Sequence, residues 1–231
     1  MTKPANVLVF GASGMVGQGV LRECLLADDV DQVTVIGRGP IGQQHPKLRE
    51  LVHKDLFDLA SLGDQLAGFD AIFYCLGVSS NGMSEADYTR TTHDLTLAIA
   101  RPLAERSPGA VFVFVSGNGA DSSEQSRTMW ARVKGKAENA VLRLPFRAVH
   151  VFRPGFIQPL HGIRSRTRAY NTLYFFLRPL VPIARLFIRK YMTTTERIGR
   201  AMLHVVRHGD ERKLLESHEI EALGRLSLAS G

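Results

Sequence analysis

Three glycines spaced three residues apart form the strongest chemical motif in the chain. They are Gly11, Gly14 and Gly17 in VLVFGASGMVGQGV, where an apolar strand pattern changes into a helical one. In such a turn the first glycine permits the sharp bend and the second lets a pyrophosphate approach the backbone at the helix N-terminus. The third lets the helix pack closely on the sheet. We therefore expect a dinucleotide to bind this turn, which also contains Ser13, Met15 and Val16.

Arg38 is the residue expected to select the cofactor. It follows the second predicted strand in VTVIGRGP, at a point where a carboxylate would hold the ribose hydroxyls of NAD. A guanidinium can instead pair with a 2′-phosphate and stack on adenine, so the sequence favours NADP. The alternative is an ordinary exposed loop arginine, with NAD as the cofactor.

Residues after the third and fourth predicted strands complete the expected cofactor site. In HKDLFD, Asp55 is well placed for the adenine amino group, with Leu56 beside it. In CLGVSS, Gly77 lies where the backbone must pass close to the cofactor, and Cys75 and Leu76 precede it. Aspartate and glycine also form turns after strands, so turn formation is the alternative role for Asp55 and Gly77.

Short apolar runs alternate with longer helical patterns along the chain. Strands are predicted at residues 6–10, 33–36, 51–54, 71–76, 111–115 and 148–152, with intervening helices such as 15–27, 88–104 and 129–142. The apolar runs are continuous, which is typical of parallel strands buried on both faces. Strict alternation of strand and helix predicts the α/β class, with a doubly wound parallel Rossmann-type sheet flanked by helices.

The chain length suits one compact domain. Its 231 residues are 45% hydrophobic and 22% charged, as in soluble globular proteins, and no repeat or linker divides them. We expect a single domain over 1–231, with a small, mostly helical extension at about 156–212. In it, a helix from Pro182 and a helix between a Thr193–Glu196 capping box and Gly209 would each have one apolar face.

Positive charge is concentrated in the C-terminal half, although the formal net charge is only +7. Residues 125–209 contain 17 lysines and arginines against two acidic residues, whereas residues 1–124 have a balance of −6. One interpretation is a solvated surface; the other is a surface that faces an anionic small molecule, an anionic lipid or a membrane. Nucleic acid is the weakest candidate, because no recognition motif accompanies the charge. The sequence does not indicate an oligomeric state.

Targeting and metal motifs are not evident in the sequence. The start, MTKPANVLVF, runs into a strand pattern without the features of a secretory signal, and Cys24 and Cys75 lie within apolar runs typical of reduced core thiols. We therefore expect a cytoplasmic protein. His204 and His208 are four residues apart without a third ligand nearby, so we predict no metal site.

The motifs together resemble those of an atypical short-chain dehydrogenase/reductase, nearest to the NADPH-binding Tat-interacting-protein branch. The likeness rests on the glycine triplet, IGR, CLG, VSGNGAD, RVKGKAE and VFRPG in that order, and covers nearly the whole chain. The resemblance implies that Ser116 hydrogen-bonds a substrate carbonyl or hydroxyl and that Lys134 holds the nicotinamide ribose. It further implies that Pro154 and Gly155 line the nicotinamide, and that the C-terminal third contacts a small-molecule substrate.

Trp130 stands where this family has its tyrosine, four residues before Lys134. Residues four apart share a helix face, so both side chains are expected at the reaction centre. Indole has no acidic hydroxyl, and the usual proton donor is therefore missing. Tyr88 and His93 are candidate replacements, although ordinary helix-surface positions explain them more simply.

Two functions follow from these residues. The first is an NADP-dependent oxidoreductase or epimerase-like enzyme for a small carbonyl or alcohol, which uses Ser116 and Lys134 with a nonstandard proton donor. The alternative is a catalytically weak or inactive protein that senses NADPH and regulates a partner.

Overall fold

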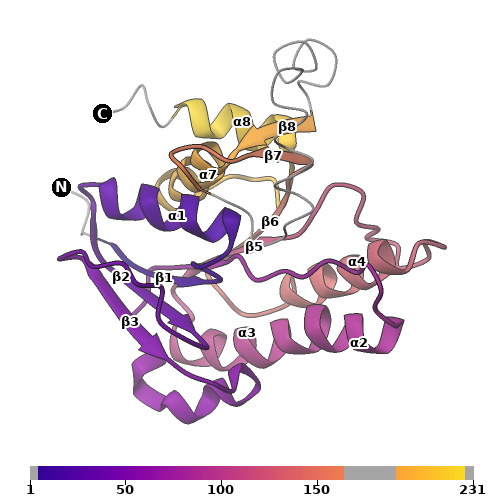
Figure 1. Cartoon of the computed structure of the whole chain (residues 1–231), viewed down its shortest axis with the longest axis horizontal. Coiled ribbons are helices and arrows are strands. Elements are labelled where there is room, and N and C mark those ends of the chain that lie inside the picture. The colour runs from indigo at the N-terminus through magenta and orange to yellow at the C-terminus, as the bar shows by residue number, and fades with distance from the viewer. Residues whose placement is uncertain (1–4, 164–190, 227–231) are drawn as a thin grey trace.

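The computed structural model describes residues 5–163 and 191–226, which form two parallel sheets and the helices around them (Figure 1). The larger sheet has seven parallel strands in the order β3–β2–β1–β4–β5–β6–β9. They are β1 (Ala5–Phe10), β2 (Val30–Gly37), β3 (Leu48–Val52), β4 (Ala71–Tyr74), β5 (Val111–Val115), β6 (Ala148–Arg153) and β9 (Leu214–Glu216). The predicted doubly wound Rossmann-type sheet is confirmed.

Helices cover both faces of this sheet (Figure 1). α1 (Met15–Leu26), α7 (Thr195–His208) and α8 (Ser217–Leu226) lie over one face, and α3 (Leu95–Arg106), α4 (Met129–Val141) and the 3₁₀ segment η1 (Leu56–Leu66) lie over the other. In β1, Val7 and Val9 belong to the first core, whereas Leu8 and Phe10 belong to the second. Burial on both faces explains why the apolar runs are continuous.

The strand order reverses between β1 and β4. The chain moves outward from β1 to β2 and β3, returns to β4 on the other side of β1, and continues through β5 and β6. The connections that leave the carboxyl ends of β1 and β4 therefore diverge, and ligands of open α/β sheets bind in such a crevice. The glycine turn follows β1 directly and so lies at this point.

Several short elements were not predicted. β9 adds a seventh strand, and β7 (Phe156–Gln158) pairs with β8 (Met192–Thr194) in a small parallel sheet within the extension. Strands of three residues are too short for their apolar pattern to be recognised. The helix predicted at 88–104 is divided into α2 (Glu85–Thr89), a π-helical turn η2 (Arg90–Asp94) and α3.

The cap of α7 lies one residue later than predicted. The Thr194 hydroxyl accepts a hydrogen bond from the Arg197 amide at 3.0 Å, so the predicted capping box at Thr193 is wrong. The helix ends at Gly209, which has a φ of +71°, as the sequence predicts. The helix predicted from Pro182 lies outside the described residues.

α1 and α7 pack at very short range. A Cβ atom added to Gly19 would lie 2.6 Å from Cβ of Thr195, and one added to Gly199 would lie 2.8 Å from Cγ of Glu23. Glu23 is buried in this contact and accepts a hydrogen bond from Nε of Arg200 at 2.9 Å. The helix that begins at the glycine turn is therefore braced by the C-terminal part of the chain.

His150 is expected to make the folded protein less stable at acidic pH. It is buried in β6; Nδ1 contacts the Arg212 carbonyl at 3.0 Å, and Nε2 has no hydrogen-bond partner in the described part of the chain. Burial lowers the pKa of His150 below its usual value of 6.5. As the pH falls, His150 therefore takes up a proton in the unfolded chain before it does so in the folded chain. The contribution of neutral His150 to the free energy of unfolding is thus fully present above pH 6.5 and is lost as the pH falls below that value.

Thermal unfolding of His150→Asn between pH 7.5 and 5 (roughly one unit either side of an ordinary histidine pKa) tests this expectation. Asparagine keeps a donor for the Arg212 carbonyl but does not titrate, so Tm should fall less on acidification than in the wild type. The exposed His218→Asn variant is the control and should show the full wild-type decrease. An equal decrease in all three proteins would contradict the assignment.

Candidate cofactor and active site

Contacts within the protein require glycine at two positions of the turn after β1. Gly11 has a φ of +77°, and a Cβ added to it would lie 2.7 Å from the backbone carbonyl of Cys75. A Cβ at Gly17 would lie 2.1 Å from the carbonyl oxygen of Gly11. Either substitution would force backbone segments apart. The turn is thus held against the end of β4, next to Cys75 and Leu76.

The N-terminus of α1 fits the pyrophosphate of a dinucleotide. The amides of Met15, Val16 and Gly17 have no hydrogen-bond acceptor within the described residues, and the first helical turn has no acidic side chain. A Cβ at Gly14 would approach only the Gly11 carbonyl, at 3.2 Å, so the protein itself hardly requires glycine there. A phosphate bound to the amides of Met15, Val16 and Gly17 would require glycine at position 14, because a side chain there would keep the ligand away from the backbone.

The residues expected to follow the second, third and fourth strands of the cofactor site differ in the contacts that they make within the protein. Arg38 directly follows β2, is exposed, and makes no hydrogen bond or ion pair with the described residues. The Asp55 carboxylate caps η1 by accepting a hydrogen bond from the Phe57 amide at 2.9 Å, while Leu56 is buried. Gly77 is exposed, with open space around its Cα. Arg38 is therefore free to bind a ligand, whereas Asp55 also has a structural role.

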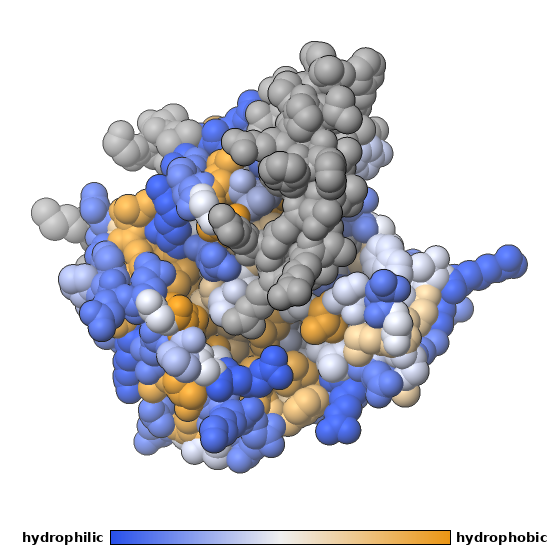
Figure 2. All heavy atoms as spheres, viewed as in Figure 1, coloured by the Kyte–Doolittle hydropathy of each residue, from blue (hydrophilic) through white to orange (hydrophobic). Residues whose placement is uncertain are grey.

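Ser116 follows β5 with a buried hydroxyl that has no partner. Its amide donates to the Phe152 carbonyl at 2.8 Å, which continues the pairing of β5 with β6, while Oγ has no hydrogen-bond partner among the described residues. A buried hydroxyl without a partner is destabilising, and such groups are rare outside functional sites. Figure 2 shows the face of the molecule that is also seen in Figure 1. Hydrophobic residues are exposed in the middle of this face, between the side of β2 and β3 and the side of α4.

Lys134 projects from α4 toward the end of β5. Its Nζ lies 5.6 Å from the centroid of the Phe114 ring and makes no hydrogen bond or ion pair with any described residue. Side chains two apart along a strand point to the same face, so Ser116 follows Phe114 on the side that α4 covers. Burial lowers the pKa of Lys134 from 10.5 to about 8, although the nearby Glu138 carboxylate raises it.

Trp130 packs on the loop that connects Ser116 to α4. A Cβ added to Gly119, which has a φ of +89°, would lie 3.1 Å from Cη2 of the indole. The partly buried ring therefore lies against a residue three positions after Ser116, on the same helix as Lys134. This position agrees with a role for the indole as one wall of the reaction centre.

The same loop is fixed to α4 by Asp121 and Gly135. The Asp121 carboxylate accepts hydrogen bonds from the amides of Ser123, Gln125 and Ser126, at 3.0, 2.9 and 2.7 Å. Its amide donates to the Ala131 carbonyl at 3.0 Å. A Cβ at Gly135 would lie 1.7 Å from the Asp121 carbonyl oxygen, so the helix and the loop touch through backbone atoms. The spacing between Ser116 and Lys134 depends on this contact.

Tyr88 and His93 lie on α2 and η2, which pack against α4. Tyr88 is only 2% exposed, so the simpler interpretation of it as a helix-surface residue is wrong. Burial raises the pKa of Tyr88, against a smaller opposite effect of Thr92, and this makes the phenol a poor acid near neutral pH. Nδ1 of His93 is 2.7 Å from the Asp94 carboxylate.

Pro154 and Gly155 join β6 to the Ser116 loop and to α8. The Pro154 carbonyl accepts a hydrogen bond from the Asn118 amide at 3.0 Å, and the Gly155 amide donates to Oγ of Ser217 at 2.6 Å. A Cβ at Gly155 would lie 2.6 Å from the Tyr191 carbonyl oxygen. Glycine is therefore required at this turn by neighbouring backbone as well.

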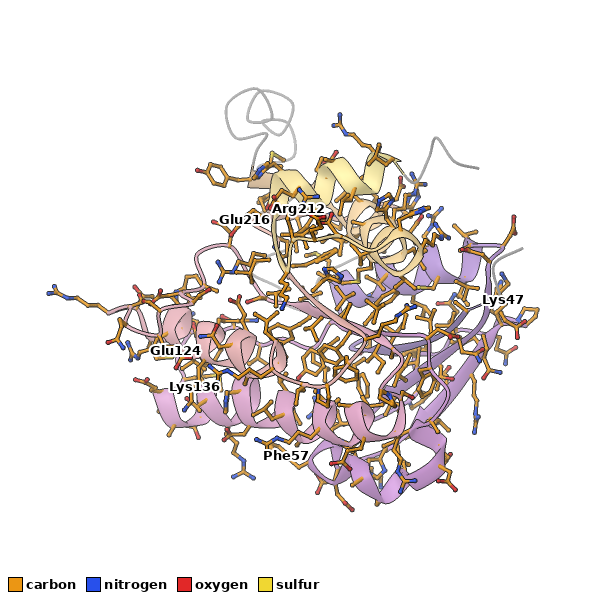
Figure 3. The ribbon with its side chains drawn as sticks, turned by 180° about the vertical axis from the view of Figure 1, so that it is seen from behind. Lys47, Phe57, Glu124, Lys136, Arg212 and Glu216 are labelled. Carbon is orange, nitrogen blue, oxygen red and sulfur yellow. The ribbon has the colours of Figure 1, made fainter. Side chains whose placement is uncertain are left out.

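A buried ion pair beside Lys134 was not predicted. Glu138, fully buried on α4, accepts a hydrogen bond from Nε of Arg153 at 3.1 Å, and its second oxygen binds Nη2 of Arg153. Arg153 also donates to Ser122 at 2.6 Å and lies 3.5 Å from Glu216, which binds Asn118 at 3.0 Å. Figure 3 shows Glu216 where β9 meets α8. No local sequence signal identifies such a network, because its members come from four separate segments.

Some arginines of the basic region form ion pairs in the part of the chain that the structure describes. Within the basic region 125–209, five described arginines form ion pairs: Arg132 with Glu85, Arg153 with Glu138, Arg197 with Glu221, Arg200 with Glu23, and Arg207 with Asp29. Three of these acids belong to the acidic N-terminal part. Among the described helices none is long and apolar enough to cross a membrane, and no group of three or more potential metal ligands occurs among the described residues.

The reversed strand order and the glycine turn that lies at it define a nicotinamide-dinucleotide-binding Rossmann protein of the short-chain dehydrogenase/reductase type. Residues 7–135 match the NAD dependent epimerase/dehydratase family. The chain belongs to this family.

Named relatives agree with this assignment. Protein HTATIP2 of Rattus norvegicus is 31% identical over 155 residues, which are 66% of this chain and 62% of the rat protein. The mitochondrial protein fmp52 of Emericella nidulans is 32% identical over 172 residues, which are 71% and 70% of the two chains. The fold also resembles the Bordetella bronchiseptica enzyme WbmH in complex with NAD⁺, with a TM-score of 0.63 and 15% identity over 88% of this chain and 72% of that one.

The fungal relatives correct one expectation. The proteins of Emericella nidulans and of two further fungi are named as mitochondrial. The cytoplasmic location predicted from the sequence is therefore wrong. That prediction relied on the lack of a secretory signal, a feature that does not distinguish the cytoplasm from an organelle.

Proposed function

We propose that this protein is an NADP-dependent oxidoreductase or epimerase-like enzyme that acts on a small carbonyl or alcohol. The observation that carries the proposal is the buried hydroxyl of Ser116, which has no partner within the described residues, at the carboxyl end of the strand next to β4. The Lys134 ammonium, which has no hydrogen bond or ion pair within the described residues, lies over Phe114 of the same strand. Two polar groups without partners on one face require a ligand that satisfies both. A substrate oxygen and a ribose hydroxyl have the necessary chemistry.

Each residue of the site then has a defined role. The amides of Met15, Val16 and Gly17 hold the pyrophosphate, and Pro154 and Gly155 support the nicotinamide end. When bound, the cofactor accepts or supplies a hydride. Ser116 hydrogen-bonds and orients the reacting oxygen, and Lys134 holds the ribose. Trp130 excludes water from the reacting atoms with its large apolar ring.

Arg38 supports NADP over NAD, since it is exposed at the end of β2 and has no partner within the described residues. Loss of a charge-assisted hydrogen bond to a 2′-phosphate costs about 1.5–3 kcal/mol. Arg38→Ala should therefore bind NADPH roughly 10- to 100-fold more weakly and NADH with unchanged affinity, as measured by calorimetric titration. Arg147→Ala is the control, because Arg147 is exposed at the amino end of β6, whereas Arg38 follows the carboxyl end of β2. Equal wild-type affinities for NADPH and NADH would contradict the proposed NADP preference.

The second candidate function is an NADPH-sensing regulatory protein without turnover. Trp130 favours it, because an indole cannot replace the phenol of the family as an acid. Purified protein that binds NADPH but oxidises none across a panel of aldehydes and ketones would support this function. Contact of the basic region with an anionic lipid is also a proposal, and the ion pairs of its described arginines reduce the charge available for it.

A further inference from the structure

The missing phenol leaves the reaction centre with one strong candidate for an acid. Trp130 offers only an indole N–H, Tyr88 is buried with a raised pKa, and His93 is bound to Asp94. Lys134 is the remaining acidic group, and its Nζ lies 5.6 Å from the centroid of the Phe114 ring, two residues before Ser116. We infer that the ammonium of Lys134 itself donates the proton to the substrate oxygen, an assignment that rests on the proposed function.

The position of Lys134 suits proton donation. Nζ carries three hydrogens, so it can hold a ribose hydroxyl and still offer one hydrogen to a second acceptor. Within the described residues it makes no hydrogen bond or ion pair that would compete, and its nearest ring contact is the face of Phe114. Ser116 Oγ follows on the same face of β5 and has no partner either. A carbonyl oxygen that Ser116 binds is therefore approached by Lys134 from α4.

Lys134 is also a suitable acid at physiological pH. Burial lowers its pKa to about 8, close to the pH at which a general acid is most effective. Among the described residues, the carboxylate that influences this pKa is that of Glu138, one helical turn away, which raises it. The other titratable or charged groups on the elements packed against α4 are Glu85, which is bound to Arg132, Asp87, Tyr88, Arg90, the His93–Asp94 pair, Arg101, Glu105 and Arg106. Glu138 therefore provides a means of changing the acidity of Lys134 without altering the lysine.

A bound NADPH would supply a hydride, with its electron pair, to the carbonyl carbon. As the carbonyl π electrons move to oxygen, the O–H bond of the alcohol forms and one N–H bond of the Lys134 ammonium breaks. The products are the alcohol, NADP⁺ and a neutral Lys134 amine, which regains its proton from water.

The first test measures Lys134 without cofactor. The chain has seven lysines, and NMR of protein labelled with ¹³C at the lysine ε-carbons should show one that titrates near pH 8. This signal should disappear in Lys134→Arg, persist in Lys136→Arg, and titrate at lower pH in Glu138→Gln. Lys136 is the matched control, since it is exposed and lies on α4 two residues after Lys134.

The second test measures NADPH binding and carbonyl reduction in the same variants. Wild-type turnover should fall as the pH rises above about 8, because the ammonium loses its proton. In Glu138→Gln this decrease should begin at lower pH, in step with the NMR titration. Lys134→Arg keeps the charge but not the acidity, so it should bind NADPH within a few-fold of wild type and lose about 10²–10⁴-fold in turnover.

The outcomes separate the two proposals. Turnover that survives in Lys134→Arg, or a pH profile that stays fixed while the Lys134 titration moves in Glu138→Gln, would overturn the assignment of Lys134 as the donor and leave the enzyme proposal intact. Wild-type protein that binds NADPH without turnover at any pH would overturn the proposed function, and the donor assignment with it. If Lys134→Arg does not bind NADPH, the wild-type and Glu138→Gln profiles decide.

Discussion

Trp130→Tyr is expected to reduce aldehydes and ketones faster than the wild type, but by less than the roughly 10²–10⁴-fold that a positioned acid adds to a site without one, because Lys134 already donates a proton. The indole lies on α4, one turn before Lys134, and packs on the loop that follows Ser116. A phenol there places a hydroxyl beside both groups. The positive charge of Lys134 would lower the pKa of this phenol, which would then act as a second proton donor while Lys134 holds the ribose. The measurement is the steady-state rate of NADPH oxidation across a carbonyl panel as a function of pH.

Trp130→Phe is the matched control. It removes the indole N–H and the second ring without adding an acidic hydroxyl, so its rate should stay at or below that of the wild type. A gain confined to Trp130→Tyr identifies proton transfer as the limiting deficit. If wild type already reduces a carbonyl rapidly and Trp130→Tyr does not change that rate, Trp130 does not lie at the reaction centre.

Gly135→Ala should destabilise the protein, although alanine normally strengthens a helix. In the interior of a helix, alanine is favoured over glycine by about 1 kcal/mol. At Gly135 the added Cβ would lie 1.7 Å from the Asp121 carbonyl oxygen, and only movement of backbone can relieve that overlap. Such overpacking costs about 1–3 kcal/mol or more, which for a chain of this size lowers Tm by about 2–12 °C. We also expect reduced turnover, because the contact sets the spacing of Ser116 and Lys134.

Thermal unfolding and NADPH titration of Gly135→Ala test this expectation against Gly109→Ala. Gly109 precedes β5, and a Cβ there would meet nothing within 4 Å. The control should unfold within a few degrees of wild type. An increase in the Tm of Gly135→Ala would show that helix propensity dominates and that α4 and the loop are not in backbone contact.

Local spacing was sufficient to predict some parts of the site but not others. The glycine turn, the buried strands and the shared face of Trp130 and Lys134 depend on residues close together in the chain, and their geometry follows from helix and strand repeats. The pairing of Glu138 with Arg153 and of Asn118 with Glu216 joins residues on different elements. Only the folded topology brings these side chains together. The ion pairs between arginines of the basic region 125–209 and acidic residues of the N-terminal part also join residues far apart in the chain. The sequence pattern therefore could not predict them.

The contact between α1 and α7 has a consequence for how the chain is made. Arg200, the partner of the buried Glu23 carboxylate, follows it by 177 residues. At ribosomal rates of about 5–20 residues per second, Glu23 and the apolar face of α1 emerge roughly 10–35 s before α7 is synthesised. During that interval the first strands expose a surface on which chaperones or incorrect partners can bind. The nascent cofactor-binding half therefore completes its fold only after α7 has left the ribosome.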